Sequence, residues 1–234
     1  APRIVKPSVP EPEAGPEPGP GPTEWGEGRV GVGPWEVEHP GQPRPTGAKW
    51  DPELLDSGDR RNVVDRYRYW SRDAIVADLD TRRHPFHVAI ENFGHDANIG
   101  TVVRTANAFL AAEVHIVGRR RWNRRGAMVT DRYQHLRHHE DVAGLMSWAE
   151  GEGLPVVAVD NLPGAEPLET VSLPRGCVLL FGQEGPGVSD DARYRAARTV
   201  SIAQFGSTRS INAGVAAGIA MHAWVREHAG PPPA

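Results

Sequence analysis

The chain has 234 residues and a formal net charge of -4, with its ten histidines counted as neutral. It has no run of about 18 apolar residues and no basic segment followed by an apolar one at its start, so nothing indicates a membrane span or secretion. We therefore expect a cytoplasmic protein with no membrane partner. The one cysteine, Cys177, lies in the apolar run CVLLF and is expected to be an inert core residue.

The first 48 residues differ in composition from the rest. Twelve of the 22 Pro and nine of the 26 Gly lie within the first 50 positions. Runs such as PEPEAGPEPGPGP cannot bury enough apolar area to offset the entropy lost when the chain is ordered. We expect residues 1–48 to form a disordered or loosely docked tail, in which Trp25 and Trp35 are candidates for docking on a surface.

Apolar residues at helical spacing predict one helix over residues 60–80, within a helical extension at 49–84. Beyond it, strand-like and helix-like segments alternate, which predicts an α/β domain with a mostly parallel sheet at 85–228. Strands are expected at 86–92, 113–118, 155–161, 177–182 and 199–203, and helices at 100–110, 141–153, 210–228 and from Ser189. In the last helix, Gly214 and Gly218 cost about 1 kcal/mol each relative to Ala and therefore require a close contact.

The segment FGQEGPGVSDD, residues 181–191, follows an expected strand and is rich in glycine. A nucleoside-triphosphate loop needs Lys and then Ser or Thr after its last Gly, whereas Gly187 is followed by Val188 and Ser189. The glycines are spaced G-x-x-G-x-G, which also differs from the dinucleotide-binding pattern G-x-G-x-x-G. The sequence therefore excludes both standard nucleotide loops.

Polar residues follow three of the expected strands at their C-terminal ends, where parallel sheets place their ligands. The three segments read HDANIGTVVRTA, GQEGPG and QFGSTRSINAG. They resemble, in order and spacing, the signature motifs of the SpoU-type (TrmH-like) RNA ribose methyltransferases of the SPOUT superfamily. The matching residues are Asn98, Gly100, Arg104 and Thr105 in the first motif, Phe181, Gly182, Glu184 and Gly187 in the second, and Ile202, Gly206, Ser210 and Asn212 in the third.

The chain departs from the family pattern at two positions of the third motif. Ala203 stands where the family usually has Pro, and Ile211 stands where it has Leu. Both replacements are apolar, so we expect the wall of the binding pocket to be preserved.

The resemblance implies a fold, a cofactor and an assembly. The family fold is a parallel sheet whose C-terminal part forms a deep trefoil knot, an exception to the rule against knotted chains. S-adenosylmethionine would bind in the knot, largely through main-chain groups, and the glycines of the second motif would let the backbone approach it closely. Family members are homodimers. Carried over by position, the cofactor contacts fall at Val159, Gly182, Ile202 and Ile211.

The resemblance also implies the catalytic residues. Arg104 would contact the RNA phosphate beside the target ribose and assist deprotonation of its 2'-hydroxyl. A guanidinium is nearly always charged, so the phosphate role is favoured on physical grounds. Asn98 and Asn212 would hold the ribose or the loops, and Glu184 would orient Arg104 or tie down loop amides.

A basic segment, RRRWNRR at residues 119–125, is the densest positive cluster of the chain. Arginine binds phosphate through a planar fork and stacks on bases, so the segment predicts contact with the RNA backbone, with its Trp stacking on a base. A solvated basic loop is the alternative. The expected RNA-binding residues are Arg119, Arg120, Arg121, Trp122, Arg124 and Arg125, together with Ser210 of the third motif.

Simpler interpretations remain for several residues. Asn98 and Ser210 are also suitable helix caps, and Glu184 could only brace its loop. The histidines of YQHLRHHED lack Cys partners and the i, i+4 spacing of a zinc helix, so they predict no metal site and suggest polar loop residues near RNA. These histidines are His135, His138 and His139.

The substrate and the activity leave alternatives open. Only about 35 ordered-looking residues precede the first strand, which is too few for the separate RNA-binding domain of some rRNA-modifying relatives, so tRNA is favoured over rRNA. A knotted RNA-binding module without catalysis is one alternative to an enzyme. An ordinary nucleotide-binding α/β enzyme is another.

Overall fold

The computed structural model describes residues 31–94 and 98–230. By its internal contacts the chain divides into two compact units, and the division falls after Trp70, whereas the sequence placed boundaries at 48 and 84. Within the described ranges, no helix is both long enough and apolar enough to cross a membrane.

The first unit contains α1 (Trp35–Glu38), α2 (Pro52–Ser57) and the short 3-10 helix η1 (Asp65–Tyr67). The Trp35 ring lies 5.6 Å from the ring of Tyr69, edge to face. The fully buried Asp59 carboxylate pairs with Arg61 at 2.7 Å. Trp35 therefore docks on its own unit, and Trp25 lies with residues 1–30 outside the described part of the chain.

The single helix expected over residues 60–80 is wrong. Helix α3 (Arg72–Asp80) begins only at Arg72, where the Ser71 hydroxyl caps it by accepting a hydrogen bond from the amide of Ala74 at 3.2 Å. Tyr69 has a backbone φ of 63°, in the left-handed region that a right-handed helix cannot include. The apolar spacing upstream reflects packing of irregular segments rather than a helix.

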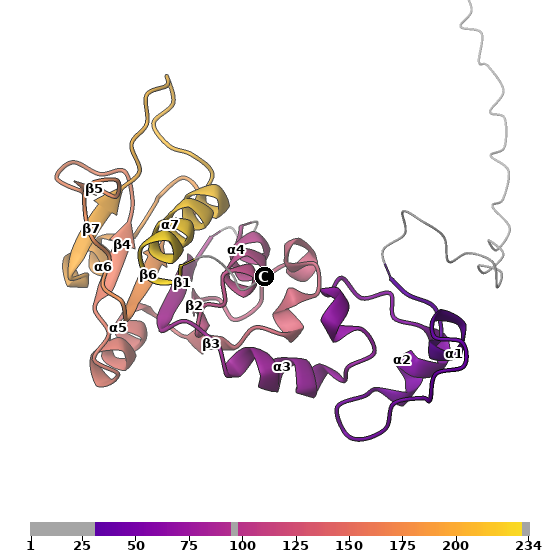
Figure 1. Cartoon of the computed structure of the whole chain (residues 1–234). Coiled ribbons are helices and arrows are strands. Elements are labelled where there is room, and N and C mark those ends of the chain that lie inside the picture. The colour runs from indigo at the N-terminus through magenta and orange to yellow at the C-terminus, as the bar shows by residue number, and fades with distance from the viewer. Residues whose placement is uncertain (1–30, 95–97, 231–234) are drawn as a thin grey trace, which may run out of the picture. The chain divides into compact units, whose positions relative to one another are not determined.

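In its described residues, the second unit is built on a seven-stranded sheet in which every strand pair is parallel (Figure 1). This confirms the predicted α/β class and the mostly parallel sheet. The strand order is β3-β2-β1-β6-β4-β7-β5, so segments distant in sequence become neighbours at its centre. The strands are β1 (Phe86–Asn92), β2 (Val114–Gly118), β3 (Leu136–His139), β4 (Val156–Val159), β5 (Glu166–Pro167), β6 (Cys177–Phe181) and β7 (Arg198–Ser201).

Helices cover both faces of this sheet. Buried residues of α4 (Ile99–Ala108) and α7 (Ala213–His228) pack on one face, and those of α5 (Val142–Gly151) and α6 (Asp190–Arg195) pack on the other. The 3-10 helices η2 (Arg124–Ala127) and η3 (Thr130–Arg132) lie between β2 and β3 in the chain. The buried residues of β1, β2, β4 and β6 alternate between the two layers, as the period of two of a strand requires.

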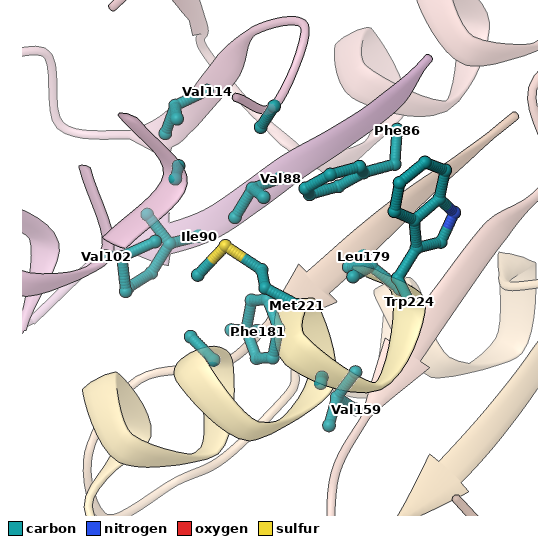
Figure 2. Packing of buried hydrophobic residues seen from close by; sticks show 14 of the residues in the cluster. Phe86, Val88, Ile90, Val102, Val114, Val159, Leu179, Phe181, Met221 and Trp224 are labelled. Carbon is teal, nitrogen blue, oxygen red and sulfur yellow. The ribbon is translucent and has the colours of Figure 1, made fainter. Parts of the chain in front are cut away.

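The larger core cluster lies between the sheet and α7 (Figure 2). Phe86 and Trp224 are fully buried with ring centroids 4.4 Å apart, and the Trp224 indole donates a hydrogen bond to the carbonyl of Pro174 at 3.1 Å. Cys177 is also fully buried, and burial raises the pKa of its thiol to about 12. This confirms that Cys177 is an inert core residue.

The glycines of α7 differ in what they require. A Cβ added to Gly214 would lie 3.0 Å from the Thr101 methyl, which confirms the predicted close contact and shows that α4 is the partner of α7 there. At Gly218 a Cβ would lie 3.8 Å from the methyl of Thr105, an ordinary contact. The close contact expected at Gly218 is therefore absent among the described residues.

Candidate active site

A cavity of about 410 Å³ opens at the C-terminal ends of β4 and β6. The four residues predicted to contact the cofactor, Val159, Gly182, Ile202 and Ile211, all line it. The expected catalytic residues Glu184 and Asn212 and the expected RNA-binding Ser210 line it as well. The structure therefore brings the second and third motifs together around one cavity.

The glycine-rich loop after β6 is closed on itself. The amide of Gln183 donates to the carbonyl of Gly187 at 3.1 Å, and the amide of Gly187 donates back at 3.0 Å. A Cβ on Gly182 would overlap the backbone of Gly187 and Val188. The sequence analysis explained this glycine by a close approach of the backbone to a cofactor. In the structure, a glycine is required here because the loop itself closes tightly on this residue.

Two carboxylates that the sequence did not single out hold this loop. Asp160 accepts a hydrogen bond from the amide of Val188 at 2.8 Å. Glu91, only 1 % exposed, accepts hydrogen bonds from both the amide of Ser189, at 2.8 Å, and its hydroxyl, at 2.5 Å. Burial raises the pKa of Glu91, against the lowering effect of these hydrogen bonds. The loop that bounds the cavity is thus anchored to β1 and to the segment after β4.

One polar residue from each of the three motifs joins a short hydrogen-bonded chain. The Asn212 side-chain amide donates to the side-chain carbonyl of Asn98 at 2.9 Å, and the Asn98 amide donates to Glu184 at 3.1 Å. Asn98 is at the N-cap position of α4 but makes no side-chain cap bond, so capping is not its role. The residue that caps α7 is Asn212, so the interpretation of Ser210 as a helix cap is wrong.

Arg104 lies on α4, six residues after Asn98, and its side chain is exposed. Among the described residues it has no hydrogen bond or ion pair, and Glu184 contacts Asn98 instead. The expectation that Glu184 orients Arg104 is therefore wrong for this structure. A charged guanidinium without a protein partner is available to an external anion.

The basic segment lies against the start of α4. A Cβ on Gly100 would approach the backbone of Gly126 and Ala127 at 2.6 to 2.7 Å, so the first-motif glycine allows η2 to pack on this helix. Asn92 at the end of β1 also fixes the segment, because its side-chain amide donates to the carbonyls of Arg119 at 2.6 Å and Arg121 at 3.2 Å. The structure therefore places this segment on the helix that carries Arg104.

The side chains of the basic segment are mostly solvent-facing. A hollow of about 450 Å³ is lined by Arg120, Arg121, Trp122 and Arg124. All five arginines are exposed, and Arg124 pairs with Asp131 at 3.1 Å. Trp122 is half-buried against the core cluster, so only part of its ring is available for stacking on a base.

The three histidines of YQHLRHHED are not one polar loop. His138 and His139 lie on β3, a strand that the sequence missed, and His139 is buried. His135 contacts Asp80 at 2.8 Å, and His138 contacts the carbonyl of Gly118 at 2.7 Å. The interpretation as loop residues is wrong for His138 and His139, which lie on a strand.

Comparison with known proteins agrees with these motifs and this fold. A sequence profile of the SpoU rRNA Methylase family matches residues 85–222. A tRNA (guanosine(18)-2'-O)-methyltransferase of Escherichia coli strain K12 is 24% identical over 156 residues, covering 65% of this chain and 68% of the relative. An uncharacterized tRNA/rRNA methyltransferase of Mycobacterium ulcerans is 32% identical over 164 residues, and the match spans 64% of this chain but 49% of that relative.

The fold resembles that of solved family members. The SpoU methyltransferase AviRb from Streptomyces viridochromogenes, determined in complex with the cofactor AdoMet, superposes with a TM-score of 0.58 and 23% identity, covering 66% of this chain and 62% of that one. The matched relatives are named as methyltransferases, which gives no support to a catalytically inactive module or to an unrelated nucleotide-binding enzyme. The chain belongs to the SpoU rRNA methylase family.

Proposed function

We propose that this protein is an S-adenosylmethionine-dependent RNA methyltransferase that modifies a ribose 2'-hydroxyl. One observation carries the proposal. The Glu184, Asn98 and Asn212 side chains, one from each family motif, are joined by hydrogen bonds at the rim of a cavity lined by the second and third motifs. The activity named for the Escherichia coli relative supports the ribose hydroxyl as the acceptor.

The cavity suits a cofactor of this kind. Its volume of about 410 Å³ lies within the range of small-molecule pockets, about 300–1,000 Å³. Apolar side chains form part of its wall, and the loop backbone adjoins them. Bound there, S-adenosylmethionine would supply an electrophilic methyl group. Val159, Gly182, Ile202 and Ile211 would hold it and exclude water from one side.

The remaining chemistry belongs to residues of the chain. Arg104 would bind the phosphate next to the target ribose, because its charge has no partner among the described residues and it is exposed. The chain from Glu184 through Asn98 to Asn212 would hold the ribose and the two loops in a fixed relation. Positioning of this kind supplies much of the acceleration of an in-line methyl transfer.

The basic segment would bind the RNA backbone beside this site. In the double variant Arg120→Ala/Arg121→Ala, we expect RNA affinity to fall and the slope of log affinity against log salt to decrease by about 1.4, since each phosphate contact to a single strand contributes about 0.7. Cofactor affinity should stay unchanged, because neither arginine lines the cofactor cavity. Filter binding of labelled tRNA at several salt concentrations measures the slope.

A matched control is the double variant Arg193→Ala/Arg195→Ala. Both arginines lie on α6, where they pair with Asp190 at 3.1 Å and Asp191 at 2.7 Å. This control should bind RNA as the wild type does. Equal losses in the two double variants would show a general charge effect and would contradict a role for the basic segment.

Three further features belong to the proposal. The deep knot is implied by the family and would involve the segments around the cavity. A homodimer is supported by apolar side chains of α7 that are exposed in this chain, Val215 at 53% and Ile219 at 40%. The cytoplasmic location and the preference for tRNA stay predictions, the second supported by the substrate named for the Escherichia coli relative.

The experiment that tests this function is a map of 2'-O-methylated nucleotides in RNA from cells with and without the protein. We expect at least one site, in tRNA, to lose its methylation when the protein is absent. An unchanged map across tRNA and rRNA would contradict the proposal.

A further inference from the structure

Two neighbouring strands bring two histidines and a glutamate together at the opposite end of the sheet from the cavity. His87 is the second residue of β1 and His115 the second of β2, whereas the cavity lies at the C-terminal ends of parallel strands. Glu113 directly precedes β2 and is two residues from His115, so their side chains share one face of the sheet. That face is covered by α5, and it is the face on which Ala89 and Val117 are buried.

The distances among the three side chains are those of a potential ligand set. His87 Nδ1 lies 3.1 Å from His115 Nε2, and Glu113 Oε2 lies 3.9 Å from the same Nε2. All three ligand atoms lie within 4.8 Å of one another. Two nitrogens bound to one zinc ion at about 2.0–2.1 Å with a tetrahedral angle stand about 3.3 Å apart, close to the spacing of the two imidazoles.

We propose that His87, Glu113 and His115 bind a divalent transition-metal ion, with zinc as the best match. Two imidazoles and a carboxylate are a ligand set that zinc uses in proteins, with the fourth position left to water. Calcium and magnesium prefer all-oxygen ligand sets, so the two nitrogens disfavour them.

The surroundings of His115 support a ligand role. Its other ring nitrogen, Nδ1, lies 2.9 Å from His139 Nε2, and the two rings are stacked. A proton on Nδ1 donated to His139 leaves the Nε2 lone pair directed toward His87 and Glu113. An outer hydrogen bond of this kind fixes the tautomer and orientation of a metal-binding histidine. Trp148 of α5 packs beside the ring, at a centroid distance of 4.2 Å.

Arg137 would compete with a metal ion for the carboxylate of Glu113. Its Nε donates to Glu113 Oε2 at 3.0 Å, and its guanidinium lies 5.4 Å from the centre of the Trp148 ring. Its side chain is 47% exposed, so it can turn toward solvent when a cation takes the carboxylate. Arg137 should therefore weaken metal binding without preventing it.

The sequence analysis predicted no metal site because it considered only histidines that are close together in the sequence, those of YQHLRHHED. The proposed ligands come from two strands that become neighbours only in the folded sheet, with 25 residues between His87 and Glu113. Because the site is remote from the cavity, we expect the ion to stabilise the fold and not to take part in methyl transfer.

The test is a titration of Zn²⁺ into the full chain, without an affinity tag and after treatment with a chelator, followed by calorimetry. The wild type should bind one zinc ion and melt at a higher temperature in its presence. His87→Gln and Glu113→Gln should each weaken binding by more than about tenfold, because loss of even an outer partner costs about 10–100-fold. Arg137→Gln should bind zinc more tightly than the wild type. His115 is fully buried, so its replacement would also disturb the packing around it. The test therefore uses the other two ligands.

His135→Gln is the matched control, since the His135 side chain is exposed and contacts Asp80 rather than any of the three proposed ligands. It should bind zinc as the wild type does. The proposal is overturned if the wild type binds no zinc, if His87→Gln binds it equally well, or if His135→Gln loses as much affinity. Cofactor affinity should not change in any of these variants, so a failure here is distinguishable from a failure of the proposed methyltransferase function.

Discussion

Replacing Arg104 with alanine should reduce methyl transfer to RNA by about 100- to 1,000-fold, the usual effect of removing one group that stabilises charge in a transition state. The reason is the position of this side chain. It is exposed on α4, has no ionic partner among the described residues, and lies on the helix that begins beside Asn98. Single-turnover methylation with labelled cofactor measures the effect. Cofactor affinity should be unchanged, because Arg104 does not line the cavity.

Two companion variants make this prediction specific. Arg104→Lys keeps the charge but loses the planar fork, so it should recover part of the rate. Arg195→Ala removes an exposed helical arginine on α6 and should leave the rate unchanged. Full activity in Arg104→Ala would remove this residue from the catalytic site.

Replacing Gly182 with alanine should have the largest effect on the cofactor cavity. The added Cβ would overlap the backbone of Gly187 and Val188, and no flexible side-chain end can move aside there. The loop would have to open, losing the paired hydrogen bonds between Gln183 and Gly187. We expect binding of S-adenosylmethionine to be lost and stability to fall by about 1–3 kcal/mol, the usual cost of overpacking.

The matched control for Gly182 is Gly206→Ala. Gly206 belongs to the third motif, but a Cβ there would meet nothing within 4 Å and its φ is not in the left-handed region. It should keep the wild-type melting temperature. Calorimetric titration with S-adenosylmethionine compares the two variants. If Gly182→Ala binds the cofactor normally, the closed loop is not a requirement of the cavity.

The fold was predictable where the apolar pattern was strong. The segments CVLLF and FHVAIEN form buried strands, as expected, and the structure places them side by side at the centre of the sheet. The strand β3 was missed because LRHH is polar in sequence, although His139 is buried against its neighbours. The helix expected over residues 60–80 failed because apolar spacing carries no information on the backbone of Tyr69.

The part of the candidate site that could be predicted is the part formed by residues of the three sequence motifs. The four expected cofactor residues line one cavity, and Asn98, Glu184 and Asn212 are in contact. Glu91 and Asp160, which hold the loop, were not singled out, because each lies more than 25 residues from its partner. An acidic residue at the end of an apolar strand was the one signal that pointed to Glu91.

The chemical identity of the product tests the proposed function most directly. Purified protein is incubated with unmodified tRNA and S-adenosylmethionine labelled in the methyl group, and the RNA is digested to nucleosides for mass spectrometry. We expect label in a 2'-O-methylnucleoside, and this label should depend on Arg104. Label in a methylated base, or cofactor binding with no transfer to tRNA or rRNA, would contradict it.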